Sequence, residues 1–340
     1  RYDILTDKNV ELSLTSVGIR ATINKTKNGN VVKNSADELI GKKYTLTISK
    51  LSSLIQKANR NTKDYSGTLT VAIKQKSVTD TNNNGNIGKT LTVGISSKDG
   101  KETGTAIIVD TVKPEVKRVD KVKVEEQSNG KTSAILNISG VDTYFESSTL
   151  VTGSYTAEQI KNKIKVYVNG KETSTGITVN ISDQEYLTEK RYTNKIEETV
   201  RYGVKYKLTI GGLNTEANKI EIEVQEGVIK DNSENVNEKT KFIIYSKLKT
   251  TSSETAGTST FLGISGITRQ QIEKIIFVDS KDKVLGNTKY NVAADGGDSI
   301  IAGYVDSDGN GKYEVYVGSD GYIFANNNSS YLFANTVIKE

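Results

Sequence analysis

The chain has 340 residues, a net charge of +5, and no cysteine, histidine, methionine or tryptophan. Without cysteine there are no disulfides, thiolate nucleophiles or cysteine-ligated metals, and without histidine there is no Ser-His-Asp triad or imidazole ligand. An enzyme built on this sequence would depend on carboxylates, Lys or Tyr alone, so we predict that the chain is not an enzyme.

Composition also limits the cellular location and the binding partners that we expect for the chain. A cysteine-free chain rich in Lys, Asn, Thr and Ser fits an exported bacterial β protein, so we expect an extracellular protein, secreted or on a bacterial cell surface, although a chain without cysteine is also tolerated in the cytosol. Lys and Glu are interspersed along residues 219–226, which indicates a solvated strand face rather than the clustered basic patch that nucleic acid needs. No apolar run approaches the roughly 20 residues of a membrane span, so we expect no membrane insertion. Because no initiator Met or signal peptide precedes Arg1, we expect a piece of a longer precursor.

The first module is expected over residues 1–110. Apolar and polar residues alternate over 44–48, 68–73 and 90–95, which is typical of half-buried strands, and 51–58 fits a short helical turn. The single proline, Pro114, marks the boundary that follows, because proline fits a strand start or linker and not a central strand.

The second module is expected over residues 111–247. Polar turns separate its short alternating runs, which favours an antiparallel sandwich. The runs cover residues 116–124, 133–138, 164–168, 177–181, 197–210, 220–224 and 241–245. Thr156–Gln159 has the form of a capping box and predicts a short helix, while Asn169-Gly170 predicts a hairpin turn.

The first two modules repeat one layout. Lys43–Ile48 matches Lys205–Ile210, and each is followed by a second alternating run, an Asp/Asn loop and a last strand. A spacing longer than any solenoid period indicates tandem domains rather than a single enzyme fold. The Lys43–Ile48 run comes much earlier in the first module than the Lys205–Ile210 run does in the second, so we predict that the first module lacks its first strands. Those strands would lie upstream or come from another chain; the alternative is a shorter module that is complete as it stands.

The third module is expected over residues 248–340. The Ser/Thr/Gly-rich residues 250–260 indicate a linker or long loop. Thr268–Gln271 is another capping box and predicts one short helix before a strand through Phe277. Two alternating runs, 299–305 and 312–317, are joined by the polar residues 306–311 and predict a hairpin.

Motifs in the first two modules resemble bacterial immunoglobulin-like domains of surface proteins. The residues that carry this resemblance are Val109-Asp110-Thr111-x-x-Pro114, Val141-Asp142-x-Tyr144-Phe145, and the loops 78–86 and 228–231. The resemblance implies immunoglobulin-like sandwiches, and it implies nothing about a ligand.

The third module resembles the BspA-like leucine-rich-repeat surface proteins. The matching segments are Ile267-Thr268-x-x-x-Ile272-x-x-Ile275-x-Phe277-Val278-Asp279, Asp298–Tyr304, Tyr313–Gly318 with Gly321, and Ala325–Phe333. In that family the segment precedes surface repeats, and adhesion is the usual proposal. This chain departs from the pattern because it lacks the tryptophan expected before Asp298 and stops at Glu340 without repeats.

One loop of the third module has part of a Ca²⁺-binding pattern. Its candidate ligands are Asp306, Asp308, Asn310 and Glu314, whose oxygens would face inward around Gly311. The acid expected at the twelfth position is missing, so the alternative is a plain hairpin turn. Residues 80–85 have the same half-motif with less charge, and no other cofactor is expected.

The chain holds 17 tyrosines against six phenylalanines, a bias that suits recognition surfaces but also strands. The candidate ligand patch of the third module consists of Tyr304, Tyr313, Tyr316, Tyr322 and Tyr331. Asp295 and Asp298 lie in a Gly-rich turn with no tryptophan to stack on a sugar, which argues against a glycosidase. A Lys–Asn isopeptide crosslink would need a buried Lys, Asn and acid together, and spacing does not single out a triplet among so many.

The sequence thus predicts a mainly β protein of tandem immunoglobulin-like β-sandwiches plus a smaller β-rich C-terminal module with one short helix. The leading hypothesis is a non-enzymatic stalk that presents an adhesion module to a protein or glycan of a host or bacterial surface. Two alternatives remain: a surface-layer or filament subunit that self-associates by strand complementation, and a glycan-binding module.

Overall fold

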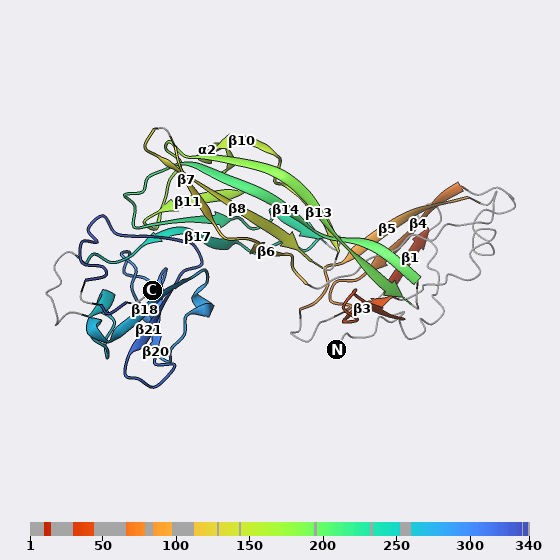
Figure 1. Ribbon diagram of the computed structural model, residues 1–340. Coiled ribbons are helices and arrows are strands. Elements are labelled where there is room, and N and C mark those ends of the chain that lie inside the picture. The colour runs from red at the N-terminus through yellow and green to blue at the C-terminus, as the bar shows by residue number, and fades with distance from the viewer. Residues whose placement is uncertain are drawn as a thin grey trace, which may run out of the picture.

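The computed structural model describes residues 10–14, 30–43, 66–78, 84–96, 112–127, 129–142, 144–193, 196–231, 234–251, 260–334 and 336–338. The chain is mainly β, as predicted, and its sheets lie in a row (Figure 1). The N-terminal strands lie at one end of the elongated molecule, the second module lies in the middle, and the C-terminal strands lie at the other end.

Two sheets enclose the core of the second module. One contains β6 (Glu115–Arg118), β7 (Lys123–Glu126), β8 (Thr132–Val141), β10 (Gly153–Thr156), β13 (Thr178–Thr193) and β14 (Ile196–Leu213). The other contains β11 (Ile164–Val168), β12 (Lys171–Glu172), β15 (Lys219–Val224) and β17 (Thr240–Lys247). Alternate side chains of both sheets share one core, in which Leu136, Leu208 and Ile222 are almost fully buried.

Shorter elements close the second module. The strands β9 (Phe145–Ser148) and β16 (Ile229–Asp231) form a two-stranded sheet of their own. The short helix α2 (Ala157–Ile160) begins with the predicted capping box, in which Thr156 and Gln159 exchange side-chain and backbone hydrogen bonds. Helix α2 buries Ala157 and Ile160 in the sandwich core, which explains its place before β11.

The first module repeats part of the second. Its three-stranded sheet of β1 (Val10–Leu14), β4 (Ser66–Ile73) and β5 (Lys89–Ser96) has the same strand order as β11, β15 and β17. The antiparallel register is also the same: Ile73 pairs with Lys89, as Val224 pairs with Thr240. The second alternating run and the last strand of the sequence repeat are therefore a structural repeat, whereas the match of residues 44–48 lies outside the described residues. The predicted loss of the first strands falls largely on residues outside the described ranges and stays a prediction.

A buried asparagine fixes the same loop in both repeats. Asn86 and Asn237 are each 0% exposed. Each Oδ1 accepts a hydrogen bond from the backbone N–H eight residues earlier, Val78 or Ile229. Each Nδ2 donates to two backbone carbonyls, one twelve residues earlier and one on the next residue. These asparagines replace ladder hydrogen bonds where the chain leaves one strand and approaches the next.

The first and second modules are joined by sheet pairing. β13 and β14 form a long hairpin that runs out of the sandwich toward the N-terminal strands (Figure 1). At the tip of the hairpin, Tyr192 and Thr193 of β13 pair antiparallel with Lys33 and Val32 of β2 (Asn30–Lys33). β2 in turn forms a hairpin with β3 (Leu39–Lys43), so the two hairpins meet edge to edge in one sheet.

The third module is built on the four-stranded sheet β18-β21-β20-β19. Its strands are β18 (Ile272–Val278), β19 (Tyr290–Asn291), β20 (Ile301–Val305) and β21 (Tyr313–Gly318), and short 3-10 turns lie at Phe261–Gly263, Arg269–Gln271 and Lys281–Lys283. β18 and β21 are parallel, while β20 and β21 form the predicted antiparallel hairpin. The core includes Phe261, Ile300, Val315 and Val317, each 0% exposed.

The second and third modules are also joined by sheet pairing. β22 (Tyr322–Phe324) leaves the third module and adds to the second module's sheet, parallel to β17. Gly321 allows this approach, because a Cβ there would lie 2.7–2.9 Å from Ile243 and from the backbone of Ile244. Beyond β17, Lys249 N donates to Val292 O, so backbone hydrogen bonding to the third module continues past the end of the strand.

Most of the strands predicted within the described residues are present, with shifts at their ends. The run 116–124 is divided into β6 and β7, because Val119 and Asp120 turn outward and bind Asn137. The capping box at Thr268 starts a 3-10 turn that passes directly into β18. The predictions for residues 44–48 and 51–58, and most of the predicted linker 250–260, lie outside the described residues.

Candidate functional site

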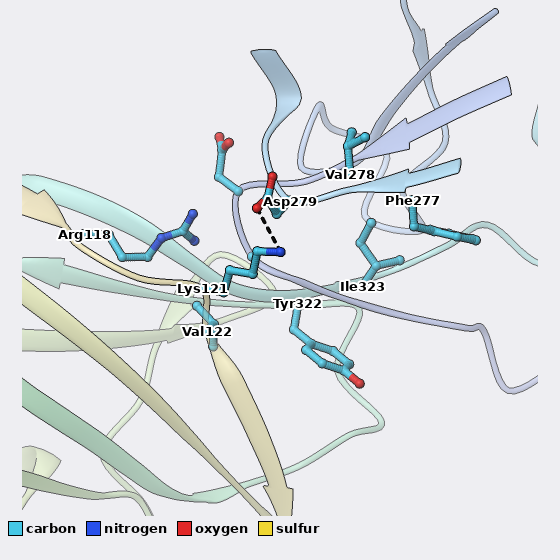
Figure 2. Close-up of a pocket in the computed structure, with 10 residues that line it drawn as sticks. Arg118, Lys121, Val122, Phe277, Val278, Asp279, Tyr322 and Ile323 are labelled. Atoms are coloured by element: carbon cyan, nitrogen blue, oxygen red, sulfur yellow. Dashed lines mark ion pairs between the residues drawn. The ribbon is translucent and has the colours of Figure 1, made fainter. Parts of the chain in front are cut away.

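An open groove of about 320 Å³ lies where the second and third modules meet (Figure 2). The end of β6 and the turn before β7 form one side, and the end of β18 and the start of β22 form the other. We call it the junction groove, and its lining residues are Arg118, Lys121, Val122, Phe277, Val278, Asp279, Asp320, Gly321, Tyr322 and Ile323.

Acidic groups of the junction groove are bound by neighbouring amines and amides. The Asp279 carboxylate contacts Lys283 at 2.7 Å on one oxygen and Lys121 of the second module at 3.0 Å on the other. Hydrogen bonds from Lys283, and then from Lys121, hold the pKa of Asp279 well below its usual range. Asp320 accepts a hydrogen bond from the backbone N–H of Lys281 at 3.1 Å. Of these contacts, the Lys121–Asp279 ion pair joins the second module to the third.

The remaining polar group of the groove is Arg118. Burial lowers the pKa of the Arg118 guanidinium, while the charges of Asp320 and Asp279 oppose this shift. The rings of Phe277 and Tyr322 are 50% and 42% exposed and point away from the ion pair (Figure 2). Two exposed rings that line an open groove suit binding of another surface better than they suit catalysis.

A second inter-module ion pair lies away from the groove. Lys219 of β15 contacts Asp295 of the third module at 3.1 Å, and both side chains are largely buried. Burial raises the pKa of Asp295, but hydrogen bonds from Lys219, Gly297 N and Ser299 outweigh this effect and lower it. Asp295, which the sequence placed in a polar turn, therefore helps to fix the third module on the second.

The structure places the candidate Ca²⁺ ligands in two groups. Asp306 accepts hydrogen bonds from the backbone N–H groups of Asn310 and Gly311, and Asn310 Nδ2 donates to Asp308, so the loop binds its own amides. Glu314 instead accepts a hydrogen bond from Tyr316 at 3.0 Å and lies 3.9 Å from Lys274. Among the described residues, no three acidic side chains gather as metal ligands would.

The candidate tyrosine patch is divided among different surfaces. Tyr304 and Tyr313 are half-buried, and their rings meet edge to face at 5.1 Å beside the third-module core. Tyr290, which the sequence analysis did not select, stacks on Tyr304 at 6.1 Å. Tyr316 lies on the opposite face of β21 and binds Glu314. Tyr322 lines the junction groove, and Tyr331 lies in the C-terminal turns, 45% exposed.

Sequence reasoning missed the residues that hold the junction. These residues come from three separate segments, and no spacing in the sequence links the segments: Arg118 with Lys121, Asp279, and Asp320. Arg269 was also missed: it is 2% exposed, and its Nη1 donates to the carbonyls of three residues of the C-terminal turns, Tyr331, Leu332 and Ala334. No sequence pattern marks Arg269 as buried, because it follows the capping-box threonine in a polar run where an exposed side chain is the usual expectation.

Comparisons of this chain with protein-family models, with curated proteins and with solved structures find no match. None of the helices in the described ranges is both long and apolar enough to cross a membrane.

Proposed function

We propose that this chain is a non-enzymatic protein of the bacterial cell surface, in which the first two modules form a rigid stalk that presents the third module. The observation that supports this proposal is the continuation of β-sheet pairing across both junctions, from β2 to β13 and from β17 to β22. Bending at either junction requires the breaking of backbone hydrogen bonds, whereas a flexible linker bends freely.

The long hairpin gives the stalk its reach. β14 has 18 residues, and at about 3.3 Å per residue it spans roughly 60 Å. That length exceeds a single sandwich and carries the hairpin from the second module to β2 of the first. An extended, stiff molecule suits the separation of a binding module from the surface that anchors it better than it suits a compact catalytic domain.

Composition and motif resemblance support the cell-surface setting. The absence of cysteine and histidine and the wealth of Lys, Asn and Thr suit an exported bacterial β protein. The resemblances to immunoglobulin-like and BspA-like modules point to the same setting. Antibodies raised against the chain should label intact cells of the source bacterium, and labelling only after lysis would refute the location.

Distance measurements between the outer modules test the stalk. The chain has no native cysteine, so two spin labels can be placed on the exposed positions Ala36 and Ser330 without background. A rigid stalk gives one narrow distance distribution. Gly321→Ala should broaden it, because the added methyl collides with β17, whereas Gly41→Ala, where a Cβ meets nothing within 4 Å, should not. A broad distribution in the unmodified chain would overturn the proposal.

The pairing of β2 with β13 favours one second function. The β2–β3 hairpin of the first module pairs there with the β13–β14 hairpin of the second through their edge strands, so this fold already uses edge pairing to connect modules. The same pairing between chains would build a surface layer or filament. Light scattering over a concentration series separates the two functions, because a stalk stays monomeric whereas a layer or filament subunit grows in mass.

A further inference from the structure

The tripeptide Asn-Gly-Lys occurs three times in the chain, at residues 129–131, 169–171 and 310–312. An Asn-Gly pair can modify itself: the glycine nitrogen attacks the asparagine side chain, ammonia leaves, and water opens the resulting succinimide ring. Glycine favours this reaction because it has no Cβ to obstruct the approach. Since the three copies share the reacting residues, differences in their reactivity in the folded chain come from the contacts of each copy.

Two of the copies hold the reacting atoms in the same turn. Lys312 N donates to Asn310 Oδ1 at 2.6 Å, and Lys131 N donates to Asn129 Oδ1 at 3.0 Å. This hydrogen bond closes an Asx turn, which folds the asparagine side chain back over the next peptide bond and brings Cγ beside the glycine nitrogen. The two glycines have φ of 75° and 73°, and a Cβ on either would meet nothing within 4 Å. Both turns are therefore open to attack by the glycine nitrogen.

The two turns differ in the group that accepts the glycine N–H. Gly311 N donates to Asp306 Oδ2 at 3.0 Å, a carboxylate oxygen that can take the proton. Gly130 N donates to Gln127 O at 3.1 Å, and a peptide carbonyl is not a base. A second hydrogen bond, from Asn310 N to Asp306 Oδ1 at 3.1 Å, fixes the carboxylate in this position. Of the two glycine nitrogens, only that of Gly311 therefore contacts a general base.

The carbonyl oxygen and the leaving nitrogen of Asn310 are also bound. The Lys312 N–H points at Oδ1, the atom on which negative charge develops when Cγ is attacked. Asn310 Nδ2 donates to Asp308 Oδ2 at 2.9 Å, which orients the amide. Asn310 and Gly311 are exposed, so water reaches the product ring. The nucleophile, a base, an oxyanion donor and an oriented leaving group thus lie in one loop.

The third copy holds its asparagine differently. Asn169 Oδ1 accepts hydrogen bonds from Asn218 N at 2.8 Å and Lys219 N at 3.1 Å, both in another segment. Asn169 also has a left-handed backbone, with φ of 49°, as the first residue of a tight hairpin turn. The fold therefore commits this carboxamide to the start of β15 instead of to its own glycine.

We propose that Asn310 is a self-modification site of the third module, which the loop converts to aspartate or isoaspartate. Gly311 N gives its proton to Asp306 and attacks Cγ of Asn310, so a new C–N bond closes the ring. The Cγ–Nδ2 bond then breaks, Nδ2 takes up the proton from Asp306, and ammonia leaves. One water molecule opens the succinimide at either carbonyl. Asparagine and water give aspartate or isoaspartate and ammonia, with no oxidant, reductant or cofactor.

The reaction changes the tip of the β20–β21 hairpin. It adds a negative charge beside Asp306 and Asp308, and the isoaspartate product inserts a methylene into the backbone of the turn. Since the hairpin belongs to the module that the proposed stalk presents, an aged surface would differ from a new one. The inference does not rest on the stalk, because all of the contacts that carry it lie within one loop.

Peptide mapping of the purified chain during incubation at neutral pH tests the proposal. Mass spectrometry after protease digestion follows the conversion of each Asn-Gly pair, and chromatography separates the isoaspartate and aspartate peptides. In the folded chain Asn310 should convert roughly tenfold faster than Asn129, a modest part of the about 10²–10⁴-fold that a positioned base supplies in enzymes. In urea the three copies should convert at similar rates. A folded-state rate at Asn310 no higher than that at Asn129, or no higher than its own rate in urea, would overturn the proposal.

Variants and the pH dependence identify the base. Asp306→Asn keeps an acceptor for the Gly311 N–H but removes the base, so the Asn310 rate should fall to that of Asn129 with an unchanged circular dichroism spectrum. Asp298→Asn is the matched control, because this exposed carboxylate of the same module contacts Lys281, and it should leave the rate unchanged. Attack driven by hydroxide speeds up about tenfold per pH unit, whereas a carboxylate base gives a nearly constant rate between about pH 6 and 8. A tenfold rise per unit at Asn310 in the folded chain, or an unchanged rate in Asp306→Asn, would refute the role of Asp306.

Discussion

Replacing Asn237 with alanine should destabilise the second module strongly. Asn237 is 0% exposed, and its amide satisfies three backbone groups: Ile229 N, Gln225 O and Glu238 O. Each buried group left unpaired costs about 1–3 kcal/mol, and partial rearrangement lowers the sum, so we expect a loss of about 3–5 kcal/mol. Since a typical domain is stable by about 5–15 kcal/mol, this single side chain accounts for a large share.

Urea unfolding followed by tyrosine fluorescence measures the global effect, because the chain has 17 tyrosines and no tryptophan. The midpoint should fall with little change in the denaturant slope. Hydrogen exchange of the Ile229 amide gives a local readout, since this N–H loses its acceptor in the variant. Asn129→Ala is the matched control, because that exposed side chain accepts one hydrogen bond, from Lys131 N, and should cost little.

Two further variants sharpen the test. Asn237→Asp keeps the acceptor for Ile229 but turns the donor nitrogen into an oxygen that faces two carbonyls, so it should be at least as harmful as alanine. Asn86→Ala should weaken the loop between β4 and β5 in the same way. A loss below about 1 kcal/mol for Asn237→Ala, with unchanged protection of the Ile229 amide, would refute the claim that this amide fixes the loop.

Three other predictions concern the third module and its junction. Gly303→Ala places a Cβ 2.2 Å from a backbone oxygen of the loop that covers the sheet, so thermal unfolding should show a loss of about 1–3 kcal/mol, unlike Gly41→Ala in open space. Arg269→Met should speed hydrogen exchange throughout the C-terminal turns, because three carbonyls lose their shared donor. Hydrogen bonds from Lys283, and then from Lys121, depress the pKa of Asp279, so these contacts stabilise the fold above about pH 4 and are lost as pH falls through the folded-state pKa. Asp279→Asn should remove this acid dependence, measured by melting from about pH 7 down to roughly pH 2, the range in which carboxylates titrate.

The sequence predicted local structure well where one segment contains the whole signal. The alternation over 164–168 gives β11 with the same bounds, and Thr156 with Gln159 forms the capping box that its spacing predicts. The loop 306–311 joins an antiparallel hairpin, because polar turn residues between two alternating runs allow little else.

The candidate sites were predicted less well, because successive side chains of a strand point to opposite faces of the sheet. Tyr313 and Tyr316 are three positions apart, so they must point to opposite sides of β21, and one continuous tyrosine patch could not form. This outcome could have been read from the sequence. The junction groove could not, since its members meet only after β22 has added to the second module's sheet.

Both junctions solve the same physical problem in the same way. A module that ends with an unpaired sheet edge exposes backbone donors and acceptors, and these invite unwanted pairing with other chains. Here β2 and β22 each occupy part of such an edge, so the contact that protects the edge also fixes the angle between modules. Sheet pairing of this kind would stiffen both junctions, as the proposed stalk requires. At the junction of the second and third modules, the Lys121–Asp279 and Lys219–Asp295 ion pairs add side-chain contacts to this backbone pairing.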